Sequence, residues 1–123
     1  MNKYLRTIFF LTLVFQLIAT RSENPPMPNP ASVYVHFLGY KSETRKSPDG
    51  GEHGVCIFPD GTECEEWSFY RGICGKQFSY CALKGCNTEN IQKPGQSYCV
   101  CSCTDSLDHN IVTWLDEFME QHG

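Results

Sequence analysis

The sequence lacks the short motifs that mark the common catalytic and cofactor sites. It contains no Gly-x-Ser-x-Gly turn of a serine hydrolase, no phosphate-binding loop and no EF-hand spacing. It also shows no internal repeat and no Asn-x-Ser/Thr glycosylation site. These absences argue against serine-hydrolase, nucleotide and calcium chemistry. We therefore expect a protein that is not an enzyme and has no cofactor.

Basic residues are also few. The chain has ten Lys and Arg residues against fourteen Asp and Glu residues, which gives a formal charge of −4 at neutral pH. Three of the ten, Lys3, Arg6 and Arg21, lie within residues 1–22, so the chain without that segment would carry −7. Phosphate backbones and anionic lipids repel an acidic chain. Nucleic acid is therefore not an expected partner, and a membrane is a disfavoured one.

Long apolar runs are absent except at the N-terminus. Lys3 and Arg6 precede an apolar run at residues 7–19. This run suits the hydrophobic region of a signal peptide and is short for a bilayer span, which needs about 20 residues. Small residues predict cleavage after Ser22, within three residues either way. We expect residues 1–22 to be a signal peptide and the protein to be secreted and extracellular; an uncleaved anchor is the less favoured alternative.

Cysteine, by contrast, is abundant and clustered. Closely spaced cysteines in an oxidising secretory compartment form disulfides, and each bond adds about 2–4 kcal/mol by restricting the unfolded chain. We expect all eight cysteines to be paired, although sequence alone does not choose the connectivity. The eight are Cys56, Cys64, Cys74, Cys81, Cys86, Cys99, Cys101 and Cys103.

Three of these cysteines alternate along the chain, at Cys99, Cys101 and Cys103. In an extended segment they would point to one face, and each would reach a different distant cysteine. The alternative is a tetrahedral zinc site in which these three and His109 supply the ligands. Secretion disfavours that alternative, because thiolates oxidise outside the cytosol. We therefore expect no metal.

Prolines and glycines divide the first half of the remaining chain. Residues 23–30 hold four prolines and predict a flexible lead-in. Asn29 suits an N-cap and Pro30 the first helical position. A short helix is therefore expected over residues 31–38, and Gly39 would stop it.

Two matching Pro-Asp-Gly turns follow, at residues 48–50 and 59–61, and they predict antiparallel pairing of the segments beside them. The expected strands lie at residues 41–46, 54–58 and 62–64. Thr62 and Glu65 have the spacing of a capping box, in which each side chain bonds the other's backbone N–H. This box predicts a short helix that ends at Gly72.

The second half is less regular. Residues 72–104 show no clean periodicity and are expected to be loops tied by disulfides, within a disulfide-rich domain at residues 31–104. Residues 105–123 predict a C-terminal amphipathic helix that packs on this domain, or alternatively docks to a partner. Together these elements predict a small disulfide-rich α+β fold. The helix's apolar stripe would be Leu107, Ile111, Trp114, Leu115 and Phe118.

One succession of motifs resembles a known family. In order, the chain reads NPASVY at residues 29–34, PDGG at 48–51, GVC at 54–56, FPDG at 58–61 and EEW at 65–67. Over roughly residues 28–72 it resembles a small family of secreted proteins and lipoproteins, mostly bacterial, catalogued as a domain of unknown function and often given a haemolysin label. The resemblance implies a compact extracellular α+β module with no established catalytic residues.

The chain departs from that family at one position. The family usually carries a cysteine where Val35 stands, and the resemblance implies that this cysteine would bridge to the position of Cys56. With valine there, the resemblance leaves open whether Cys56 is paired.

Three functions are consistent with these features. The first is a secreted, disulfide-stabilised, toxin-like effector from a venom or defence secretion. It would bind an extracellular protein such as a channel or receptor, with exposed aromatics, Trp67 or Tyr70, in the contact. The second is a protease inhibitor that presents Lys76 or Lys84 from a crosslinked loop to a trypsin-like protease. The third is membrane lysis, which only the family's label suggests. The sequence leaves the oligomeric state open.

Overall fold

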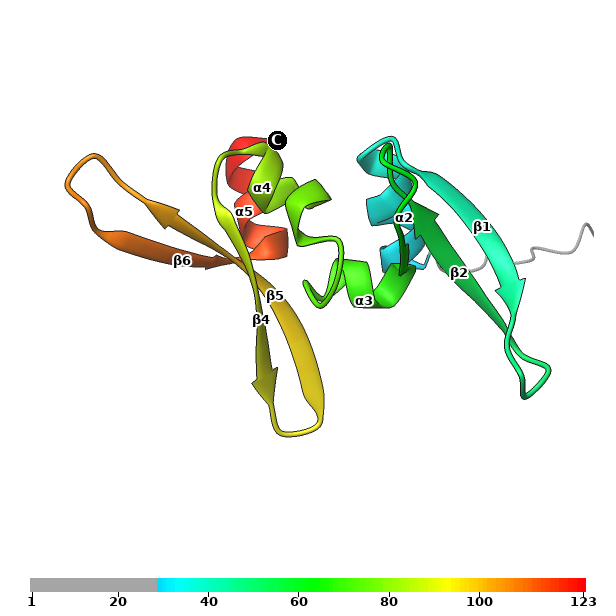
Figure 1. Ribbon diagram of the computed structural model, residues 1–123. Helices are drawn as coiled ribbons and strands as arrows, with labels where there is room; N and C mark the ends of the chain where they lie inside the picture. The colour runs from blue at the N-terminus through cyan, green and yellow to red at the C-terminus, as the bar shows by residue number, and fades with distance from the viewer. Residues whose placement is uncertain (1–28) are drawn as a thin grey trace, which may run out of the picture.

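The structure, a computed structural model, describes residues 29–123 as two three-stranded antiparallel sheets with helices between them (Figure 1). The first sheet has the order β1–β2–β3, formed by Lys41–Lys46, Glu52–Ile57 and Glu63–Glu65. The second has the order β4–β5–β6, formed by Asn87–Lys93, Gln96–Thr104 and Asn110–Trp114. The helical elements are α2 (Pro30–Phe37), α3 (Glu66–Tyr70), the 3₁₀ turn η1 (Lys76–Phe78), α4 (Tyr80–Leu83) and α5 (Leu115–His122).

This architecture confirms the predicted small, disulfide-rich α+β class. The predicted signal peptide, and most of the proline-rich lead-in, lie outside the described residues. None of the helices in residues 29–123 combines the length and apolar character that a bilayer crossing needs.

The first half forms as its local signals predict. The side chain of Asn29 accepts the backbone N–H groups of Ala31 and Ser32 at 3.0 and 3.4 Å, so it caps α2. The two Pro-Asp-Gly turns close on hydrogen bonds from Gly50 to Ser47 and from Gly61 to Phe58, each of 2.9 Å. Strand β1 lies at the sheet edge, as its polar sequence suggests.

The predicted capping box at the start of α3 is wrong in one partner. Thr62 belongs to the preceding turn, where its backbone N–H and its hydroxyl both donate to the carboxylate of Asp60. Glu65 alone caps the helix, and its carboxylate accepts the N–H groups of Trp67 and Ser68 at 3.0 and 2.8 Å. The helix therefore begins at Glu66.

Residues 87–114 form a sheet where we predicted loops and the start of a helix. Strand β6 is rich in β-branched and aromatic residues, which favour strands, and it pairs with β5. The carboxylate of Asp105 accepts the N–H groups of Leu107 and His109 at 2.8 Å each, so it fixes the turn that returns the chain to β5.

The predicted C-terminal helix over residues 105–123 is therefore shortened to α5. Its supposed apolar stripe is divided between two elements. Leu107, Ile111 and Trp114 are 72%, 51% and 41% exposed, whereas Leu115 and Phe118 are buried. Only the last two pack on the core as the helical pattern predicted.

The core is aromatic and is reinforced by three disulfides. Phe69 lies at its centre, with its ring 5.1 Å from that of Tyr34 and 5.0 Å from that of Phe58. The disulfides join Cys64 to Cys74, Cys81 to Cys101, and Cys86 to Cys103. As the alternation predicted, Cys101 and Cys103 project from an extended strand to two distant partners.

The prediction that all eight cysteines are paired is wrong for Cys56 and Cys99, which are buried thiols in the described part of the chain. Cys56 shares the core with Val35, the residue that stands where the family has a cysteine. Cys99 packs against the backbone of Gly72, where an added Cβ would lie 3.0 Å from its sulfur. Because Cys101 and Cys103 are in disulfides, the zinc alternative is also wrong; residues 29–123 contain no metal-binding cluster.

The two thiols should not react with thiol reagents until the protein unfolds. Burial raises the pKa of Cys56 to about 11 and that of Cys99 to about 12, so both stay protonated at pH 8. We expect a thiol reagent to label neither residue in native buffer and both in denaturant, as counted by mass spectrometry. Labelling of no thiol in denaturant without reductant would show a fourth disulfide, between Cys56 and Cys99.

Candidate functional site

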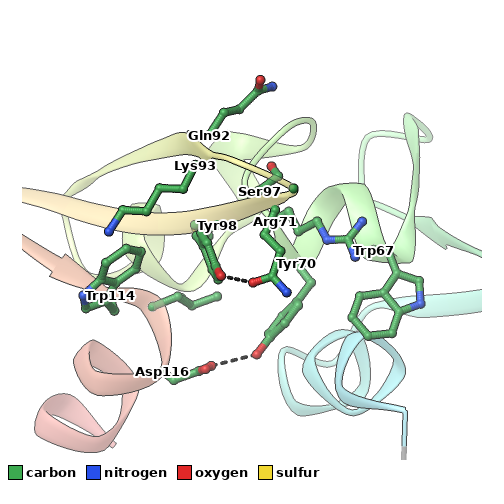
Figure 2. Close-up of a pocket in the computed structure, with 13 residues that line it drawn as sticks. Trp67, Tyr70, Arg71, Gln92, Lys93, Ser97, Tyr98, Trp114 and Asp116 are labelled. Carbon is green, nitrogen blue, oxygen red and sulfur yellow. Dashed lines mark hydrogen bonds between the residues drawn. The ribbon is translucent and has the colours of Figure 1, made fainter.

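A groove of about 670 Å³ lies between α3 and the second sheet (Figure 2). Three elements supply its walls: α3 with the residue that follows it, the β4–β5 hairpin, and the junction of β6 with α5. In that order, the main side chains are Trp67, Tyr70 and Arg71, then Lys93 and Tyr98, then Trp114 and Asp116.

Local structure explains why these side chains meet. Trp67 and Tyr70 are three residues apart on α3, so they share one face of the helix, with ring centroids 6.0 Å apart. Tyr98 and Trp114 lie on neighbouring strands, and their rings meet edge to face at 5.4 Å. The groove is thus an aromatic surface built from segments far apart in the sequence.

A cation lies over each tryptophan of the groove. The guanidinium carbon of Arg71 is 5.1 Å from the ring centroid of Trp67, and Nζ of Lys93 is 4.9 Å from that of Trp114. Both distances fit cation–π contacts. Neither cation takes part in the ion pairs found among residues 29–123. Both positive charges are therefore held in place without a carboxylate partner.

The floor of the groove is polar, and its tyrosine hydroxyls are already hydrogen-bonded within the protein. The hydroxyl of Tyr70 donates to Oδ1 of Asp116 at 2.8 Å. Burial, and then this hydrogen bond, raise the pKa of Tyr70 to about 12. The hydroxyl of Tyr98 donates to the side chain of Gln96. At neutral pH the Tyr70 hydroxyl and the Cys99 thiol are thus neutral, which suits the groove to binding by hydrogen bonds, apolar contact and the two cations.

The structure brings together only two of the four predicted binding residues. Trp67 and Tyr70 line the groove, and Lys76 and Lys84 do not. Lys76 begins the turn η1, and Lys84 is the C-cap that follows α4, with its Nζ 5.4 Å from the ring centroid of Tyr80.

Sequence reasoning missed the other groove residues. Arg71 and Lys93 had no motif around them, and Trp114 was assigned to the buried face of a helix. The signal for Trp114 was the sequence Asn-Ile-Val-Thr-Trp at residues 110–114, whose composition favours a strand over a helix. A strand would have left that tryptophan beside β5 instead of on the core.

The comparisons with known proteins give a family and no activity. The model of the family described as a domain of unknown function (DUF333) matches residues 26–73. An uncharacterized protein of Archaeoglobus fulgidus is 34% identical over 113 residues, which are 91% of this chain and 51% of that protein. The chain therefore spans about half the length of that relative. No solved structure matches the chain.

These findings support the family resemblance over the first half of the chain, and they leave the haemolysin label unconfirmed. The matched segment contains Trp67, Tyr70 and Arg71. Lys93 and Trp114 lie beyond it, so the groove combines one wall from the family segment with walls that the family model does not include. Residues 26–73 of this protein are thus similar to a family whose function is unknown.

Proposed function

We propose that this is a secreted, non-enzymatic binding protein whose groove holds an extracellular protein target. The observation that carries the proposal is the composition of the groove. Both tryptophans of the chain line it, together with two tyrosines and an arginine. Trp, Tyr and Arg are the residues that contribute most to binding at protein interfaces. The three disulfides support secretion, because such bonds persist in oxidising compartments.

The disulfides also support binding in a second way. Cys81–Cys101 attaches α4 to β5, the strand that carries Tyr98, and Cys86–Cys103 attaches the segment after α4 to the same strand. A groove whose side chains are already held by crosslinks, cation–π contacts and hydrogen bonds loses little conformational entropy when a target binds. Rigid aromatic side chains in a preformed groove therefore favour recognition over the other uses considered.

A protein array tests the proposal. The oxidised protein is applied to an array of extracellular proteins, together with a variant that carries Trp67→Ala and Trp114→Ala. We expect the double substitution to weaken binding of the captured target by about 30-fold. Lys84→Ala removes a cation–π pair outside the groove and should leave binding unchanged. Circular dichroism confirms that the variants fold; capture that survives in the double variant would contradict the proposal.

Toxin-like action on a channel or receptor is the narrower form of this proposal. It predicts that the oxidised protein, added to cells or to a panel of channels, produces an effect that the double variant does not. If the oxidised protein has no effect at micromolar concentration, the toxin-like action is wrong. The broader proposal, binding of an extracellular protein, would still stand.

Protease inhibition and membrane lysis are less well supported. Proteases bind extended segments, whereas Lys76 and Lys84 lie in helical turns. Lysis would need a membrane-binding surface, and interfacial helices favour Lys and Arg on the polar face, whereas the first turn of α5 carries Asp116 and Glu117. Assays of trypsin activity and of dye release from zwitterionic vesicles test these alternatives directly.

A further inference from the structure

We infer that the groove recognises an acidic segment of its target, in which two carboxylate side chains flank an apolar one. The inference rests on the proposed function and specifies the chemistry of the partner. It is carried by the two unpaired cations, the aromatic rings that hold them and the hollow between them.

The first step is the contrast between the groove and the rest of the chain. The chain as a whole is acidic, with a formal charge of −4. The groove instead carries Arg71 and Lys93 against a single carboxylate, that of Asp116. That carboxylate already accepts the hydrogen bond of Tyr70. A local positive potential on an acidic protein attracts an anionic group to this site and repels it elsewhere.

The second step is that both cations are oriented and available. Arg45, on β1, shows the contrasting case, because its guanidinium is bonded to Glu43 and Glu63 at 3.2 and 2.5 Å. Arg71 has no such partner among the described residues and lies on the ring of Trp67. A guanidinium held against a ring keeps its N–H edges for other groups, and those edges bind a carboxylate with two parallel hydrogen bonds.

The third step concerns the space between the cations. Figure 2 shows Lys93 with Trp114 at one end of the groove and Arg71 with Trp67 toward the other, and Tyr98 between them. A smaller hollow of about 370 Å³ lies at the Trp114 end. Its walls are Lys93, Asp116 and the edge-to-face pair of Tyr98 and Trp114, and the rings of that pair offer an apolar contact surface. An apolar side chain fits there, with an acidic neighbour directed to each cation.

The fourth step separates a peptide from an acidic polysaccharide. Sugar rings bind proteins by laying their C–H faces on open aromatic faces, which carry the negative part of the ring quadrupole. In this groove a cation already lies on one face of each tryptophan. A ligand that approaches from that side meets charged groups and ring edges, which favours the carboxylate side chains of a polypeptide.

Matched peptides test the inference. Short peptides that carry Asp or Glu on both sides of one apolar residue, Leu or Phe, are titrated into the oxidised full chain. The peptides contain no Trp. The same peptides with Asn or Gln in place of the acids are the control, and sodium polygalacturonate tests the polysaccharide source. Because Trp67 and Trp114 are the two tryptophans of the chain and both line the groove, tryptophan fluorescence reports binding there.

We expect the acidic peptides to bind at least about tenfold more tightly than their amide controls, and to weaken as salt is added. Arg71→Gln and Lys93→Gln should each weaken binding about tenfold, and Lys84→Gln should not change it. Equal binding of acidic and amide peptides would overturn the inference, as would polygalacturonate binding without peptide binding. The inference would also be overturned if capture of the array target depended on the two tryptophans but was unchanged by Arg71→Gln and Lys93→Gln. The proposed function would then still stand.

Discussion

Replacing Gly75 by alanine should destabilise the protein by about 2–5 kcal/mol, one of the largest effects expected from a single methyl group. Gly75 has a φ of +65°, where an L-residue costs about 1–2 kcal/mol. Its added Cβ would also lie 2.7 Å from Cε2 of Phe58 and 3.0 Å from Cδ2 of Phe69. Both rings are buried in the core, so relieving the overlap requires repacking that costs about 1–3 kcal/mol.

Urea unfolding of the oxidised protein measures this effect, and Gly95→Ala is its matched control. Gly95 has a similar φ of +80°, but an added Cβ there meets nothing within 4 Å. The free energy of unfolding of the control should therefore fall only by the cost of an L-residue at positive φ, about 1–2 kcal/mol. Equal losses in the two variants would mean that the rings of Phe58 and Phe69 do not approach Gly75 as described.

Removing the bond between Cys81 and Cys101 should cost about 3 kcal/mol. The bond closes a sequence separation of 20 residues, so it restricts the unfolded chain more than the Cys64–Cys74 bond, which closes 10. Both sulfurs are also fully buried, so the double substitution to alanine leaves a small cavity in addition.

Thermal unfolding without reductant compares the two bonds. We expect the variant with Cys81→Ala and Cys101→Ala to have the lower melting temperature, and the variant with Cys64→Ala and Cys74→Ala to lose less. The first variant should also bind its array target more weakly, because β5 supplies Tyr98 to the groove. A reversed order of stability would show that loop length and burial do not decide the contribution of these bonds.

The parts of the fold that sequence reasoning predicted are those fixed by local chemistry. Asn29 caps α2, and the two Pro-Asp-Gly turns set the register of the first sheet, because each signal acts within a few residues. Strand β6 was predicted as helix because Leu115 and Phe118 do follow a helical spacing. The pairing of β6 with β5 overrides that pattern, and it depends on the turn made by Asp105.

Only the part of the binding groove whose residues lie close together in the sequence was predicted. Trp67 and Tyr70 stood out because they are large aromatics on one short helix next to the cysteines. Lys93 and Trp114 join them only through the pairing of three strands, which no local signal in the sequence reveals. Lys76 and Lys84 were predicted as binding residues because they are lysines near cysteines, but in the structure they lie in helical turns outside the groove.

The three disulfides have a consequence for how the molecule is divided. Cys64–Cys74 lies wholly on the side of the first sheet, and the other two bonds lie wholly on the side of the second. Among residues 29–123 no disulfide joins the two sides, so they are held together by the shared core and by hydrogen bonds such as Tyr34 with Tyr80, Tyr40 with Phe78 and Tyr70 with Asp116. The groove lies across this seam. Its width is therefore set by core packing together with the tyrosine hydrogen bonds, and a ligand that contacts both walls would add a further link between two halves that are each crosslinked separately.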